Sequence, residues 1–153
     1  MASKVTKFIT ISIGSEEIKL CELDNSKRNV SVLWAETVPT PANSYDEGEI
    51  VDIEKISKLL KQTIFKNRIN AKHVIFTVQG PKFANKEITI PNVKKDKIRS
   101  VVDANCSEYF PINTEEYVFS YSVLESFVQE GRKQLRLMIV AAPEDIIESY
   151  YTL

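Results

Sequence analysis

The chain has 153 residues, enough for one ordinary domain or two small ones. Hydrophobic residues make up 43% and charged residues 27%, a composition that excludes a disordered protein. With 20 basic and 21 acidic residues the net charge is -1, so there is no electrostatic case for nucleic acid as a partner.

The segment Met1–Lys7 has no apolar run behind its charges, so it is not a secretory signal peptide. No run of apolar residues is long enough to span a bilayer, which excludes direct membrane insertion. We therefore expect a cytoplasmic protein. Cys21 and Cys106 have no second cysteine or histidine at metal-ligand spacing, so we expect two reduced thiols and no metal site.

Residues 8–23 form two apolar runs on either side of a Gly-Ser-Glu-Glu break, which predicts a β-hairpin. Gly14 permits a positive φ or a close approach to the backbone, and Ser15 adds a hydroxyl and N–H groups at the turn. With Lys19 two residues beyond the turn, an ammonium group and N–H donors could face one anion. An ordinary tight hairpin explains the same residues equally well.

The next segments complete a first α/β unit. After a turn at Asp24–Asn29, a third strand is predicted, antiparallel to the second, with one shared face: Val30, Val32, Trp34 and Val38. Residues 42–49 are expected to form a polar surface connection. Asp52 can cap a helix with one apolar stripe, Ile53, Ile56, Leu59, Leu60 and Ile64, and its lysines are interpreted as the solvated face. A strand over residues 72–79 then joins the sheet by a crossover.

A second unit begins after Gly80. A strand over Phe83–Ile90 precedes a helix capped by Asn92, with an inner face of Ile98, Val101, Val102 and Tyr109. Two long strands follow, joined by a turn at Gln129–Arg132. The aromatic residues that alternate in the first of them are interpreted as core, because basic residues do not interleave with them as on a base-stacking platform.

Pro143 is predicted at the first position of a last helix, which lacks a terminating Gly or a final basic residue. This pattern favours a piece of a longer protein. His73, with no nucleophile motif near it, is interpreted as a strand residue, and no catalytic residue is predicted.

The spacing Ser12-x-Gly14-Ser15-x-x-x-Lys19 resembles the first phosphate loop of the actin-like superfamily. Within it, the chain resembles the type IV pilus assembly PilM family over almost its whole length. The further motifs that carry this resemblance are Glu47–Asp52, Gln79-Gly80, Ile90-Pro91, Glu108–Ile112 and Val140–Pro143.

The resemblance implies an α/β (α+β) fold in two parts. Residues 1–80 would be the first part of an actin-like (ribonuclease H-like) subdomain 1A with a mixed sheet. Residues 81–153 would be a small inserted β-α-β-β subdomain, similar to the 1C (SHS2-like) subdomain of the cell-division protein FtsA, ending in a truncated helix.

The resemblance also implies function. The family binds ATP with Mg²⁺ between two actin-like halves, and a groove beside the inserted subdomain takes the cytoplasmic amino-terminal tail of an inner-membrane partner, PilN. Such a protein would be cytoplasmic and peripheral to the inner face of the membrane. Self-association and pilus ATPases are further partners that the resemblance allows.

Two departures limit what carries over. Ser12 stands where the family's loop has an Asp that helps hold hydrated Mg²⁺, and the second actin-like half is absent. We therefore expect Ser12, Gly14, Ser15 and Lys19 to form only a partial phosphate loop, with no cofactor bound by this chain. The expected role is a non-hydrolysing adaptor. The alternatives are an actin-like nucleotide-binding ATPase and an FtsA-like membrane-associated polymer.

Overall fold

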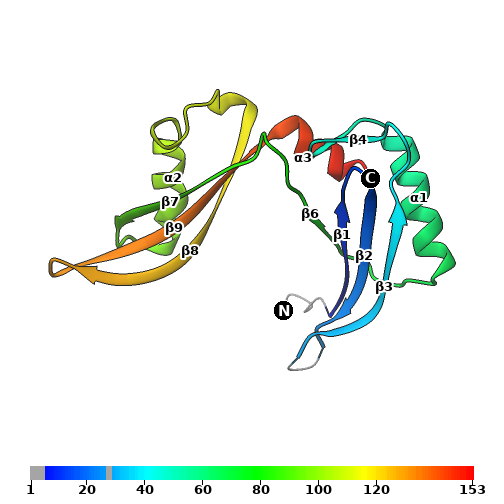
Figure 1. The fold of residues 1–153 in the computed structure, drawn as a ribbon. Coiled ribbons are helices and arrows are strands. Elements are labelled where there is room, and N and C mark those ends of the chain that lie inside the picture. Colours follow the sequence, from blue (N-terminus) through cyan, green and yellow to red (C-terminus); the bar gives the residue numbers. More distant parts are fainter. Residues whose placement is uncertain (1–5, 27–28) are drawn as a thin grey trace. The chain divides into compact units, whose positions relative to one another are not determined.

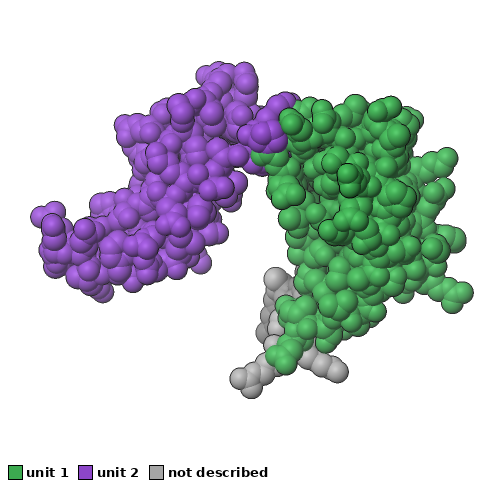
Figure 2. All heavy atoms as spheres, viewed as in Figure 1, with its two compact units in different colours: residues 1–80, 148–153 green, residues 81–147 purple. Residues whose placement is uncertain are grey.

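The computed structural model describes residues 6–26 and 29–153 (Figure 1). Two residues of the predicted Asp24–Asn29 turn, 27 and 28, lie outside the described residues, as do residues 1–5. The described chain forms two compact units (Figure 2). Unit 1 runs to Gly80 and also includes Glu148–Leu153, whereas unit 2 is Pro81–Ile147. The sequence analysis had assigned the last six residues to the second unit.

Unit 1 is built on a mixed four-stranded sheet in the order β3-β2-β1-β6. Its strands are β1 (Lys7–Ile13), β2 (Glu17–Asp24), β3 (Ser31–Pro39) and β6 (Val74–Thr77). The first three are antiparallel neighbours, as predicted, and β6 returns parallel to β1. The isoleucines of β1 alternate with Thr10 and Ser12, so the isoleucines are buried on one face and the hydroxyls lie on the other.

Helix α1 (Ile53–Lys66) has the predicted cap. The Asp52 carboxylate accepts a hydrogen bond from the backbone N–H of Lys55 at 3.0 Å and pairs with the Lys55 ammonium at 2.9 Å. These bonds to the ionised form lower the pKa of Asp52, with the Lys55 side chain as the largest cause. The helix buries Ile56, Leu60 and Thr63. Two residues of the predicted apolar stripe, Ile56 and Leu60, are therefore buried.

Unit 1 differs from the sequence-based expectation in three places. The polar connection contains a small hairpin, β4 (Tyr45–Asp46) and β5 (Glu49–Ile50). The strand expected over residues 72–79 is only four residues long. The apolar face expected on β3 is not buried at its start, because Val32 is 66% exposed in a region where the β2–β3 register shifts.

Unit 2 is a three-stranded antiparallel sheet in the order β7-β9-β8, with one helix in the predicted strand-helix-strand-strand sequence. Its elements are β7 (Ala84–Pro91), α2 (Lys95–Tyr109), β8 (Tyr117–Gln129) and β9 (Arg132–Pro143), with a short 3-10 turn at Thr114–Glu116. Leu137 and Ile139 of the central strand are fully buried.

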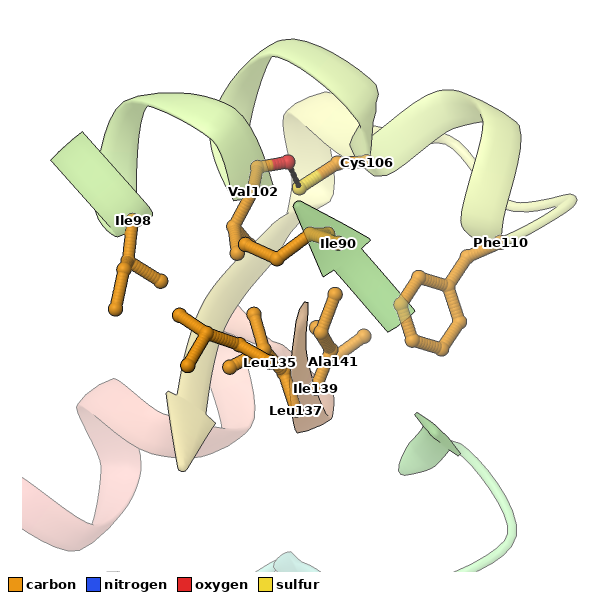
Figure 3. Packing of buried hydrophobic residues seen from close by; sticks show 9 residues of the cluster. All are labelled: Ile90, Ile98, Val102, Cys106, Phe110, Leu135, Leu137, Ile139 and Ala141. Atoms are coloured by element: carbon orange, nitrogen blue, oxygen red, sulfur yellow. Dashed lines mark hydrogen bonds between the residues drawn. The ribbon is translucent and has the colours of Figure 1, made fainter. Parts of the chain in front are cut away.

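The unit 2 core lies between α2 and the sheet (Figure 3). It includes the predicted Ile98 and Val102, and also Cys106 and Phe110, which continue the same helical face and which the sequence analysis missed. The Cys106 thiol donates to the Val102 carbonyl at 3.1 Å. Burial raises the pKa of this thiol.

Two predicted helix starts in this part of the chain are wrong. Helix α2 is preceded by Lys94, which makes no side-chain cap, and not by a capping Asn92. The Asn92 N–H instead donates to Lys133 O at 3.0 Å, because β7 pairs with β9 up to Pro91. Pro143 ends β9 opposite Tyr117 and does not begin α3, which is Glu144–Tyr151.

Two hairpins use the same dipeptide at their turns. Glu47-Gly48 joins β4 to β5 with φ values of 44° and 105°, and Glu130-Gly131 joins β8 to β9 with 50° and 74°. Two successive residues at positive φ make a type I′ turn, whose twist matches that of the paired strands. In the part of the chain that the structure describes, no helix is long and apolar enough to cross a membrane.

Candidate functional site

The β1–β2 hairpin brings the four predicted loop residues together. Ser12 and Lys19 are direct cross-strand partners, and Gly14 and Ser15 lie in the turn between the strands. A depression of about 240 Å³ at this end of the hairpin is lined by these four residues and by Gln79, among others. Gln79 follows β6, which is parallel to β1, so both chain segments reach the same end of the sheet.

Gly14 is favoured here by a close approach and not by its φ, since the described glycines with positive φ are Gly48 and Gly131. Its N–H donates to Glu17 O at 3.0 Å, and a Cβ on Gly14 would lie 3.1 Å from that oxygen. Thr40 closes the turn from outside. Its hydroxyl donates to Gly14 O at 2.6 Å and its N–H donates to Glu16 O at 2.9 Å.

The Lys19 ammonium is paired within the hairpin. It lies 2.9 Å from a Glu17 carboxylate oxygen, and both side chains are about half exposed or more. The hydrogen bond to Glu17 is the main cause that raises the pKa of Lys19. An anion at the turn would therefore have to compete with a carboxylate for this ammonium group.

A row of polar side chains crosses the sheet beside the turn. Thr37, Lys19, Ser12 and Thr77 are successive register partners on β3, β2, β1 and β6. A depression of about 340 Å³ is lined by this row and by the next residues of the same strands. The sequence analysis named only two members of the row, because the register that aligns the threonines is a tertiary property.

The residues present do not fit a magnesium-bound nucleotide by themselves. Hydrated Mg²⁺ is held through carboxylates and substrate phosphates, and position 12 carries a hydroxyl. Of the two carboxylates that line the depression at the hairpin turn, Glu16 and Glu17, the second is paired with the Lys19 ammonium. Among the described residues no group of three or more His, Cys, Asp or Glu side chains converges as a metal site.

The structure also places the other residues that the sequence singled out. His73, interpreted as a strand residue, lies instead just before β6, and its backbone carbonyl accepts from the Ile9 N–H at 2.9 Å. Both cysteines are free thiols, as expected, one on β2 and one on α2. The aromatic residues of β8 that face α2 pack against the unit 2 core, which confirms the expectation for them.

Comparison with known proteins decides the family. A family model described as type IV pilus assembly protein PilM matches residues 10–153. The chain belongs to this PilM family. The match confirms the resemblance drawn from the ordered sequence motifs.

This chain superposes on a chain of a solved structure titled "PilM-PilN type IV pilus biogenesis complex", with a TM-score of 0.82 and 19% sequence identity. The comparison covers 97% of this chain and 44% of that one, so this chain spans less than half of the matched protein. The likeness confirms the predicted actin-like α/β fold with a mixed sheet.

Proposed function

We propose that this chain acts in type IV pilus assembly as an adaptor that binds the cytoplasmic amino-terminal tail of a PilN-like inner-membrane protein. The observation that carries the proposal is the fold-level match to a PilM–PilN complex, together with family membership over residues 10–153. Binding a membrane protein in this way would hold the chain at the inner face of the membrane. Self-association and contact with pilus ATPases are further roles open to the same scaffold.

An extended tail is best bound by adding a strand to a sheet edge, where backbone groups supply affinity and side-chain pockets supply specificity. The two larger sheets of the described chain have four edge strands, and three of them are poorly suited. β6 has four residues, β3 ends at Pro39, and β7 carries Lys86, Glu87 and Pro91. Charges and prolines of this kind discourage pairing at an edge.

Edge strand β8 is the better acceptor. It has 13 residues without Lys, Arg, Pro or Gly, and its first eight residues, Tyr117–Leu124, carry no charge. Beyond them, Arg136 of β9 pairs with Glu125 at 2.9 Å and lies over the Phe127 ring at 5.3 Å, which fastens the distal part of the hairpin. Within the uncharged segment Tyr117–Leu124, the Phe119 carbonyl oxygen accepts a hydrogen bond from the Arg99 side chain of α2 at 3.1 Å. We therefore assign tail binding to Tyr117–Leu124.

Calorimetric titration of the chain with a peptide of the tail of its PilN homologue tests the proposal. Leu124→Lys places a charge on the edge at a side chain that is 47% exposed, and we expect it to weaken binding at least tenfold, about 1.4 kcal/mol. Val128→Lys, at a residue 65% exposed near the hairpin tip, is the matched control and should leave binding unchanged. Flat heats with the unmodified chain would refute tail binding, and equal losses in both variants would refute the β8 assignment.

The same proposal includes the absence of ATP hydrolysis by this chain. The supporting observations are the hydroxyl at Ser12 and the Glu17–Lys19 ion pair at the turn. Phosphoryl transfer needs converging donors and metal ions around the phosphates. Mg²⁺-dependent ATPase activity of the purified chain that is well above background and is abolished by Lys19→Ala would contradict this part and favour the actin-like ATPase alternative.

A further inference from the structure

The segment 53–73, which contains α1, concentrates positive charge. It holds six Lys or Arg residues and one acidic residue, a net +5 in a chain whose total is -1. Two of these cations are paired, Lys55 with Asp52 at 2.9 Å and Lys66 with Glu36 at 3.4 Å. Within residues 6–26 and 29–153, no acidic group lies in ion-pair distance of Lys58, Lys61 or Arg68.

These unpaired cations share one side of the helix with an exposed aromatic ring. Lys58, Lys61 and Phe65 are spaced by three and four residues, so they form one stripe on the side away from the buried Ile56 and Leu60. Arg68 follows just beyond the helix, at a φ of 54°. Phe65 is 86% exposed and is the last residue but one of α1.

A shallow depression of about 410 Å³ adjoins the ring. It is lined by the apolar Ile64, Phe65 and Ile69, and by the cations Lys61 and Arg68. The helix dipole accounts for cations at this end of α1. It gives no reason for a large apolar side chain to lie in water among them.

We propose that this stripe, Lys58, Lys61, Phe65 and Arg68, docks on an anionic phospholipid surface. Clustered basic residues on an amphipathic helix are attracted to anionic lipid, and an exposed aromatic ring can enter the interface between headgroups and acyl chains. The cations favour lipid over an acidic protein, because lysine is depleted at protein interfaces and three of the four unpaired basic positions in this segment, Lys58, Lys61 and Lys72, are lysines. The inference goes beyond tail binding and does not depend on it.

Vesicle flotation with the full chain and no partner peptide tests the inference. We expect binding to vesicles of equal parts phosphatidylglycerol and phosphatidylcholine, weakening as salt is added, and no binding to phosphatidylcholine alone. Each cation near an anionic surface contributes about fivefold in affinity, so Lys58→Glu/Lys61→Glu should weaken binding by about 25-fold or more. Lys95→Glu/Lys97→Glu makes the same charge change on exposed residues at the start of α2 and should have little effect.

The role of the ring is tested separately. Phe65→Ser should weaken vesicle binding several-fold, and Phe65→Trp should preserve it. In a Trp34→Phe background, Phe65→Trp should also give a blue-shifted emission with anionic vesicles. No flotation on anionic vesicles would overturn the inference, as would equal losses in the two lysine pairs. Binding to polyglutamate without binding to vesicles would instead assign the stripe to an acidic protein.

Discussion

The hydroxyl of Tyr150 donates a hydrogen bond to the carbonyl oxygen of Gly48 at 3.3 Å, although the two residues lie 102 positions apart. The ring of Tyr150 meets Phe76 edge-on, with 5.3 Å between centroids and planes at 70°. Tyr150 is 5% exposed. The end of α3 is thereby fixed to the β4–β5 turn and to β6, which explains why Glu148–Leu153 belongs to unit 1.

Removal of the Tyr150 contacts should destabilise unit 1. Tyr150→Phe leaves Gly48 O without this donor, and we expect a loss of about 1 kcal/mol in the free energy of unfolding. Tyr150→Ala also removes the ring and should cost about 3–5 kcal/mol. Urea unfolding measures both. The exposed neighbour Tyr151 is the control, and Tyr151→Ala should change stability by less than about 0.5 kcal/mol.

Alkaline pH should weaken the fold through the same residue. Burial raises the pKa of Tyr150 above its ordinary value of 10.0. Because the folded state holds this proton more tightly than the unfolded state, the stabilisation is fully present below pH 10 and falls as the pH rises above it. The free energy of unfolding should therefore decline from about pH 10 upward, more steeply in the wild type than in Tyr150→Phe. Identical slopes would contradict the burial of this hydroxyl.

Gly80 should tolerate no side chain. A Cβ there would overlap the carbonyl oxygen of Glu47 and lie 3.2 Å from the Cα of Gly48. Backbone atoms cannot rotate away as a side chain can, so we expect Gly80→Ala to cost about 1–3 kcal/mol. Gly80→Asn should be at least as destabilising. Gly131 is the contrasting case, because it has open space but a φ of 74°, and Gly131→Asn should be nearly neutral.

The two thiols should react at different rates. Cys106 is 5% exposed, donates to Val102 O, and has a raised pKa through burial. Cys21 is only partly buried on β2. Since the thiolate is the reactive form, iodoacetamide should label Cys21 first and Cys106 roughly 100-fold more slowly or only after opening of unit 2. Mass spectrometry of Cys21→Ser and Cys106→Ser variants assigns the rates. Fast labelling of Cys106 in the folded chain would show that this core is loosely packed.

The sequence determined most of the elements because their causes are local. The alternating isoleucines of β1, the Asp52 cap and the Glu130-Gly131 turn each follow from a few neighbouring residues. The predicted starts of α2 and α3 were wrong, because residues typical of a helix start were given more weight than the continuation of a strand. Asn92 and Pro143 are good residues for a helix start, yet pairing with β9 and β8 extends the strands over Pro91 and Pro143.

The candidate phosphate-loop site was likewise predicted in part from the sequence. The sequence placed Ser12, Gly14, Ser15 and Lys19 around one turn, since hairpin neighbours are close by construction. Only the tertiary structure decided that Lys19 pairs with Glu17 and that Thr37 and Thr77 extend its row, because side-chain pairing and register depend on strands far apart in sequence. The burial of Tyr150 and the exposure of Phe65 also depend on the tertiary structure. An apolar side chain is buried only where another part of the folded chain packs against it.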